Sequence, residues 1–247
     1  MFLKRNGLSV CAKYAYPPNS LSFCGPNKTS DLLGYVTRGS VDQGLGDMLN
    51  RFQTLSPYLK LISTANLVKD PYDLKVVEAY WIGNNYLDKV RGKRYYNFIV
   101  DDIKLKKYLK APNLDLVNNL PNGYPNHNFH VLNIFLHTGI EKESYTLPVI
   151  DKCRISWGQV LSKTEYNSQD NQYKYIVKTK PLMTTGSQLV FGPPIVKTVS
   201  SKLPFYKVGQ DVSIHWDTIC EVLDEVKLRN LDKYSQVAIA FANKILY

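Results

Sequence analysis

Apolar residues in the first 150 positions recur at intervals of three and four, the spacing of a helix with one buried face. In residues 46–68, for example, Met48, Leu49, Phe52 and Leu55 follow this period. Cap-forming residues, glycines and prolines at the ends of such segments mark where the helices start and stop. The predicted helices are 27–39, 46–68 with a new start at Pro57, 70–84, 97–109 and 127–139.

The pattern changes after Pro148. Short runs rich in β-branched and aromatic residues alternate with turn-forming stretches such as 168–171 and 184–187. Five short strands at this spacing are typical of a small barrel. Residues 217–246 return to a helical period and predict a C-terminal helix. The predicted strands are 153–166, 172–182, 187–192, 193–203 and 211–216.

The two patterns together predict an α+β fold: a mainly helical N-terminal part, then a small C-terminal β-barrel with a terminal helix. We expect a helical domain over residues 1–150 and the barrel with its helix over 151–247. The barrel is expected to begin near Cys153 and to end near Trp216.

The composition is that of a chain which buries a core, since 44% of its 247 residues are hydrophobic and 21% are charged. No apolar run approaches the roughly 20 residues needed to span a bilayer. The N-terminal segment carries positive charges but lacks the apolar run of about 7–15 residues found in a secretory signal. The sequence therefore predicts a cytoplasmic protein without a membrane segment.

The formal net charge is +10, and basic residues cluster at 89–96 and 104–110. In the second cluster Leu105 and Leu109 are four apart, which predicts a helix with a solvated basic face. A plain surface or an acidic protein partner explains such clusters more simply than nucleic acid. We therefore expect no sequence-specific nucleic-acid binding.

The four cysteines, Cys11, Cys24, Cys153 and Cys220, show neither a CxxC pair nor the spacing of a disulfide framework. Cys153 comes directly before one predicted strand, and His215 closes another. If these strands are antiparallel neighbours, the two side chains lie at the same rim of the barrel, within about 8 Å of each other, close enough to share a metal after small movements. Alternatively, the cysteine is a small buried apolar residue and the histidine a hydrogen-bonded strand end.

The segment KCRISWGQVL (152–161) resembles the start of HypC-type hydrogenase maturation chaperones, small barrels in which a cysteine precedes the first strand. The segment 208–231, with a histidine that ends a strand before an acidic and Leu-containing helix, is similar to their later part. Cys153 is internal here, whereas the cysteine of that family stands at the mature N-terminus.

The resemblance implies that Cys153 is a thiolate ligand and His215 an imidazole ligand of iron, carried as the fragment that becomes the iron group of nickel–iron hydrogenases. It also implies hydrogenase maturation proteins or the hydrogenase large subunit as partners. Thiolate and imidazole are suitable ligands for low-spin iron and other late metals.

A second group of candidates lies in the helical part. His127 and His130 are three residues apart at the start of a predicted helix, so both can project from one face. Cys24 precedes a Gly-Pro turn close to a predicted helix start, where a thiol has a lowered pKa. Glu78 is an acid within an apolar helix. These four residues predict the catalytic pocket of an acyl- or amide-transfer enzyme. Alternatively, Cys24 belongs to a tight turn, the two histidines pack at a helix start, and Glu78 faces solvent.

The whole chain is also similar to an uncharacterised prokaryotic family with the blocks AYPPN…CGP, VVEAYWIGN, HxxFHV and HWD. Membership implies no activity. Three functions remain open at this point: a metal-fragment carrier, a cysteine- or metal-dependent enzyme, and, as the weakest, a nucleic-acid-binding module.

Overall fold

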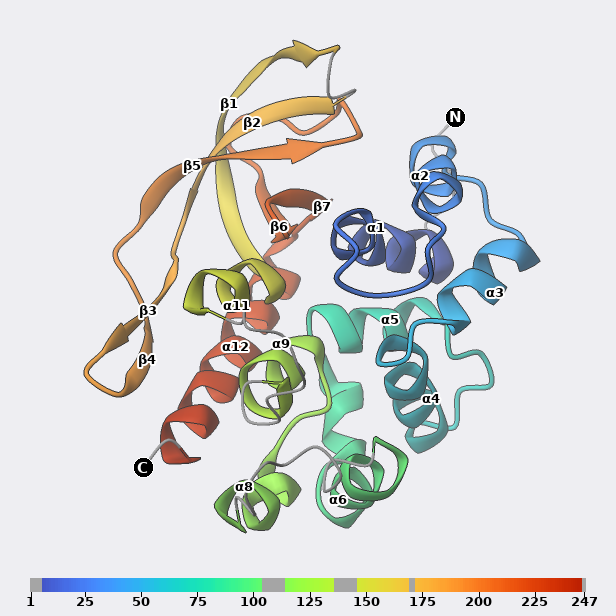
Figure 1. The fold of residues 1–247 in the computed structure, drawn as a ribbon, viewed down its shortest axis with the longest axis vertical. Helices are drawn as coiled ribbons and strands as arrows, with labels where there is room; N and C mark the ends of the chain where they lie inside the picture. The colour runs from blue at the N-terminus through green and yellow to red at the C-terminus, as the bar shows by residue number, and fades with distance from the viewer. Residues whose placement is uncertain (1–5, 104–113, 136–145, 169–171, 246–247) are drawn as a thin grey trace.

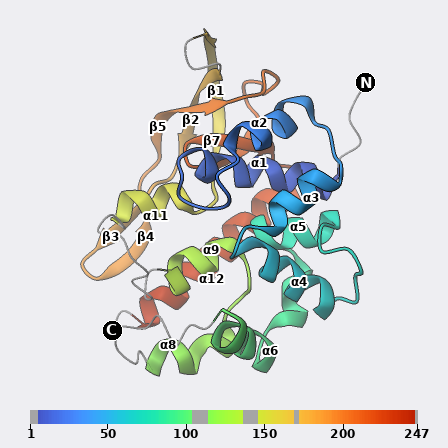
Figure 2. The same cartoon turned by 45° about the vertical axis from the view of Figure 1, so that its right-hand side comes forward.

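The computed structural model describes residues 6–103, 114–135, 146–168 and 172–245. Helices form most of the molecule, and the barrel stands against one side of them (Figure 1). The C-terminal helix α12 runs from the base of the barrel across the helical part (Figures 1 and 2). The predicted α+β fold is therefore confirmed.

Helices α2 to α5, η2, α9 and η4 lie close to the segments predicted from the apolar period, whereas the pattern did not predict α1, η1, α6, α8, η3 and α11. The basic segment 104–110 lies outside the described residues. In chain order these helices are α1 (Gly7–Ser20), α2 (Thr29–Arg38), α3 (Gln43–Asn50), α4 (Leu55–Ala65), α5 (Leu74–Trp81), η1 (Asn85–Val90), α6 (Lys93–Asn97), η2 (Phe98–Asp102), α8 (Leu114–Asn119), η3 (Leu120–Asn122), α9 (His127–Phe129), η4 (His130–Phe135) and α11 (Leu147–Cys153).

Helix α1 contains two consecutive prolines, Pro17 and Pro18, in its last turns. Proline has no N–H, so it cannot bond to the carbonyl four residues earlier in a helix. The Tyr14 carbonyl therefore receives no bond from position 17 or 18 and is left to accept one from outside the helix.

The barrel closes in the order β1-β2-β5-β7-β6. All neighbouring pairs are antiparallel except β5 and β7, which are parallel. Strands β3 and β4 form a separate two-stranded sheet outside the barrel. The strands are β1 (Ser156–Asn167), β2 (Gln172–Thr179), β3 (Leu182–Thr185), β4 (Gln188–Phe191), β5 (Ile195–Ser201), β6 (Asp211–His215) and β7 (Thr218–Val222).

Two details of the predicted barrel are wrong. The run at 187–192 is β4 of the separate hairpin and not a barrel strand. Residues 218–222, predicted as helix, form the fifth barrel strand, and α12 (Glu225–Ile245) begins only afterwards. The reason is the turn between β6 and β7: Trp216 and Asp217 both have positive φ, which reverses the chain and pairs Thr218 with His215.

The barrel has a small core of its own, built mainly from valines, tyrosines and isoleucines of its strands. A much larger core joins the helical part to residues from beyond position 150, among them Ile155, Cys220 and Tyr234. Tyr234 on α12 packs so closely on Gly83 that a Cβ there would lie 2.1 Å from its ring. The division near residue 150 stays a prediction.

No helix within the described ranges is both long enough and apolar enough to cross a membrane.

Candidate metal centre

Three side chains from distant parts of the sequence meet where the barrel contacts the helices. The ligand atoms of His127, Cys153 and His215 all lie within 4.8 Å of one another. The expected proximity of Cys153 and His215 is thus confirmed. His127, which the sequence grouped with Cys24, His130 and Glu78, also lies with these two residues.

Strand pairing brings Cys153 and His215 to the same rim. Strands β1 and β6 are antiparallel, with Ser156 opposite Ile214. The start of β1 therefore lies beside the end of β6. The N–H of Trp216 also donates to the Lys152 carbonyl at 2.8 Å, which fixes the end of α11 against the turn after β6.

The His215 ring is held in one orientation by helix α1. Its Nδ1 lies 2.8 Å from the Tyr14 carbonyl, the one that Pro18 leaves without a helical partner. A carbonyl can only accept, so Nδ1 carries the proton and Nε2 carries a lone pair. Nε2 is buried and has no hydrogen-bond partner among the described residues. A buried acceptor without a partner is costly and is therefore expected to serve a ligand.

His127 reaches the centre because its neighbour Asn128 is hydrogen-bonded to the backbone of Ile155, just before β1. The Asn128 amide donates to the Ile155 carbonyl at 2.9 Å and accepts from the Ile155 N–H at 2.7 Å. This paired contact places α9 next to the end of α11. His127 Nε2 lies 2.9 Å from the Cys153 carbonyl, and Nδ1 lies 3.3 Å from the Tyr80 hydroxyl.

Aromatic rings surround the two imidazoles. The rings of His127 and His215 have centroids 5.0 Å apart, and Trp81 lies 4.8 Å from the first and 5.7 Å from the second. The indole nitrogens of Trp81 and Trp216 are also buried without a hydrogen-bond partner in the described ranges. The two imidazoles thus lie in a mainly aromatic environment.

The turn after β6 holds two non-glycine residues in the left-handed region, Trp216 at φ 49° and Asp217 at φ 55°. Such conformations cost about 1–3 kcal/mol each and are typical of functional sites. Trp216 is held by stacking on Phe23, with ring centroids 4.1 Å apart. Asp217 is held by ion pairs with Lys152 at 3.2 Å and Lys197 at 2.8 Å.

Burial sets the protonation states of the three residues. It lowers the pKa of His127 to about 4, against the effect of the bond to the Cys153 carbonyl. It lowers the pKa of His215 well below 6.5, and it raises the pKa of the Cys153 thiol to about 12 although the residue is partly exposed. At neutral pH the centre therefore holds two neutral imidazoles and one thiol.

The donor set fits a transition metal. Bonds of about 2.0–2.3 Å in a tetrahedral site place donor atoms roughly 3.5 Å apart, so small side-chain rotations suffice from the present positions. The Nδ1–H bond to Tyr14 is the outer contact that metal-binding histidines usually make. His127 would exchange one of its two present bonds for the metal.

The other sequence candidates lie outside this group, and their catalytic roles stay predictions. His130 Nδ1 bonds to the Tyr58 hydroxyl at 3.0 Å, and burial lowers its pKa to about 3. Glu78 accepts from the Asn84 amide at 3.3 Å. The expected low pKa of Cys24 is wrong: although the residue is exposed, the protein packed around the thiol desolvates it and raises its pKa to about 12.

Comparison with known proteins assigns the chain to one family. A family of unknown function (DUF6390) matches residues 3–247, so the chain belongs to it. No curated protein and no solved structure matches. The expectation of a whole-chain family is confirmed, and the comparison gives no support to a link with the HypC-type chaperones.

The low pKa of His127 predicts an acid-sensitive fold. The unfolded imidazole titrates near 6.5 and the folded one near 4, so the unfolded state binds more protons between these values. Its contribution to stability is complete above pH 6.5 and is lost as the pH falls towards 4; about 3 kcal/mol is expected for this one group. Urea unfolding from pH 7 to 4 measures it.

The matched variant for this test is His127→Gln, whose unfolding free energy should fall less steeply over the same pH range. Carboxylates titrate in both proteins and cancel in the difference. Identical slopes would contradict a neutral, buried His127.

Proposed function

We propose that this member of the DUF6390 family binds a transition-metal ion through His127, Cys153 and His215. The observation that carries the proposal is the convergence of their donor atoms within 4.8 Å, with Nε2 of His215 buried and unpartnered in the described structure. One thiolate and two imidazoles form a set suited to zinc, iron, cobalt or copper.

Three protein ligands leave a coordination position open. Closed structural zinc sites use four protein ligands, whereas sites with three keep a position for water or substrate. A bound metal would supply Lewis-acid chemistry or an attachment point for a small ligand, while the surrounding aromatic rings exclude bulk water.

Metal binding must displace the thiol proton. The pKa of Cys153 is raised to about 12, whereas both histidines are already neutral at pH 7. The affinity is therefore expected to rise with pH through the loss of one proton.

The full chain is expected to bind one equivalent of Co²⁺ or Zn²⁺. Replacement of a ligand, in Cys153→Ser or His215→Gln, should weaken binding by more than the roughly 10–100-fold that loss of an outer contact costs. Elemental analysis and the thiolate-to-cobalt absorption band measure occupancy.

The matched controls are Cys220→Ser and His130→Gln, which remove a buried thiol and a buried imidazole outside the group. Both should retain full occupancy. Full metal content and an unchanged cobalt band in Cys153→Ser would sink the proposal.

The prolines of α1 provide a sharper test. Pro18→Ala adds an N–H that competes with His215 for the Tyr14 carbonyl. The helix should gain stability, because proline is unfavourable in a helix interior, while metal affinity should fall by about tenfold as the outer contact is lost. A competition titration against a coloured chelator measures the affinity.

Pro17→Ala is the control, because its new N–H faces the carbonyl of Lys13 instead. It should leave affinity within about twofold of the parent, well below the outer-contact effect. Equal losses in the two variants, or no loss in Pro18→Ala, would refute the role given to the Tyr14 carbonyl.

The finer proposal is that the metal is iron, carried as a fragment for delivery to hydrogenase maturation proteins or the hydrogenase large subunit. Its support is the resemblance of 152–161 and 208–231 to HypC-type chaperones, with Cys153 and His215 at the matching positions. Iron-loaded protein, prepared anaerobically alongside those partners, should show infrared bands of metal-bound cyanide and carbon monoxide that Cys153→Ser lacks. Bound metal without these bands would end the carrier proposal and leave the metal site standing.

A further inference from the structure

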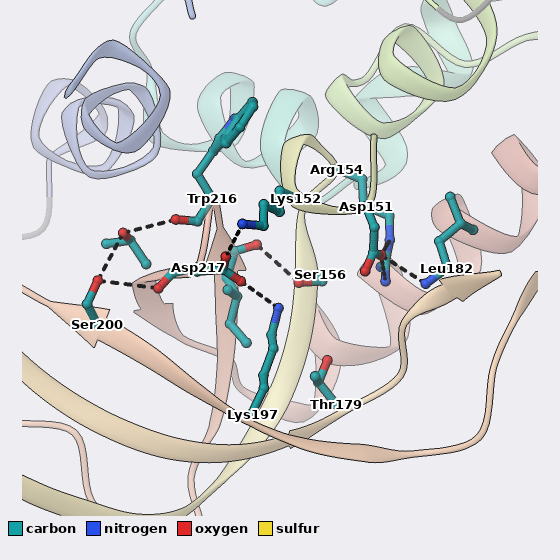
Figure 3. Close-up of polar contacts among 12 residues, drawn as sticks. Asp151, Lys152, Arg154, Ser156, Thr179, Leu182, Lys197, Ser200, Trp216 and Asp217 are labelled. Carbon is teal, nitrogen blue, oxygen red and sulfur yellow. Dashed lines mark hydrogen bonds and ion pairs between the residues drawn. The ribbon is translucent and has the colours of Figure 1, made fainter. Parts of the chain in front are cut away.

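A pocket of about 330 Å³ opens at the rim of the barrel, beside the metal centre. Residues from α11, β2, β5 and the turn after β6 line it, and the start of β1 lies beneath it. Figure 3 shows Lys152 and Asp217 turned into this space, while Trp216 points away from it towards the helices. None of the three proposed metal ligands is part of the lining.

The pocket carries an excess of positive charge. Lys152, Arg154, Lys180 and Lys197 line it, against two carboxylates. One of these, Asp217, is shared by Lys152 at 3.2 Å and Lys197 at 2.8 Å. A single carboxylate thus faces two ammonium groups.

Arg154 is the fixed element of the pocket. Its side chain is 1% exposed, which is rare for an arginine and requires partners. Nε and Nη2 bond to Asp151 Oδ1 at 2.8 and 2.7 Å, and Nη2 also bonds to the Lys180 carbonyl at 2.8 Å. Asp151 is held in turn by the Leu182 N–H at 2.9 Å. The guanidinium carbon also lies 5.1 Å from the centroid of the Phe191 ring. Arg154 therefore holds Asp151 and the Lys180 carbonyl in place at the wall of the pocket.

Lys180 supplies a further positive charge at the same rim. It is exposed, and its ammonium makes no ion pair with any described residue. The hydroxyl of Ser156 makes only a long bond of 3.4 Å to the Ile214 carbonyl and can turn towards a ligand. Pro148, Pro181 and Ile195 offer an apolar wall for an uncharged part.

We propose that this pocket binds the phosphate group of a small phosphorylated molecule. The phosphate lies among Lys152, Lys180 and Lys197, because lysine ammonium groups at a partly enclosed site form strong charge-assisted bonds to phosphate oxygens. The volume exceeds that of a bare phosphate and lies at the lower end of the range of small-molecule sites. The apolar wall receives the rest of the molecule.

The site does not depend on the metal, so the metal-free full chain is the material for its test. Isothermal titration with inorganic pyrophosphate and with glycerol phosphate, at about 0.15 M salt to suppress unspecific attraction, measures binding. We expect saturable one-to-one binding of both. Lys180→Met and Lys197→Met should each weaken it by about tenfold, the usual effect of one lost charge-assisted bond.

Lys178→Met is the matched control, since Lys178 is exposed on β2, two residues before Lys180, but does not line the pocket. It should bind as the parent does. Arg154→Lys keeps the charge but loses the fork that holds Asp151 and the Lys180 carbonyl, and it should also bind about tenfold more weakly. Because Arg154 is buried, the thermal unfolding of this variant is measured first. If the variant is unfolded, the Lys180→Met and Lys197→Met results decide.

Three results would overturn the proposal. The first is no saturable binding of either probe. The second is equal weakening by Lys178→Met and Lys180→Met, which indicates unspecific attraction. The third is displacement of both probes by a random single-stranded DNA oligomer at lower concentration, which makes the surface a nucleic-acid site. A chain that binds phosphate but no metal would leave this proposal intact and refute the metal centre.

Discussion

The hydrogen bond from His215 to the Tyr14 carbonyl is the contact on which the proposed centre depends. It exists because Pro18 cannot use that carbonyl inside α1. It fixes the imidazole with Nε2 bare and directs that atom into the junction. The Tyr14 hydroxyl also bonds to Ser213 at 2.7 Å and Glu221 at 2.8 Å, and Glu221 is paired with the buried Lys227 at 2.9 Å. Tyr14 thus joins the helical part to the barrel through both its backbone carbonyl and its side-chain hydroxyl.

The same two backbone segments, 152–154 and 215–217, serve two different environments. Cys153 and His215 belong to the buried junction, while their neighbours Lys152 and Asp217 line the basic pocket. The bond from the Trp216 N–H to the Lys152 carbonyl holds the segments together. The left-handed turn after β6 is maintained because each of its residues is held from a different side. A phosphate site and a metal site would therefore lie back to back.

The sequence predicted the parts of this structure that follow local rules. The apolar period located most helices, and the runs after Pro148 located most barrel strands. It also placed Cys153 and His215 at one rim, because antiparallel neighbours determine that relation. The β7 strand was missed because left-handed Trp216 and Asp217 have no turn signature of the Asn-Gly kind.

The sequence did not predict that His127 joins Cys153 and His215, because long-range contacts decide its place. Its position depends on the Asn128 amide, which bonds to Ile155 across 27 residues. No periodicity encodes such a pairing. The Tyr-Pro-Pro segment could have predicted an unpaired backbone carbonyl, since two prolines in a helix leave carbonyls free for other partners. Which partner is used depends on the fold.

The most direct test of the metal centre is X-ray absorption at the metal edge of the zinc-loaded full chain. The structure predicts a first shell with one sulfur at about 2.3 Å and two imidazole nitrogens at about 2.0–2.1 Å, completed by a light atom from solvent. A shell of nitrogen and oxygen alone, or one with two or more sulfurs, would contradict a centre made of His127, Cys153 and His215.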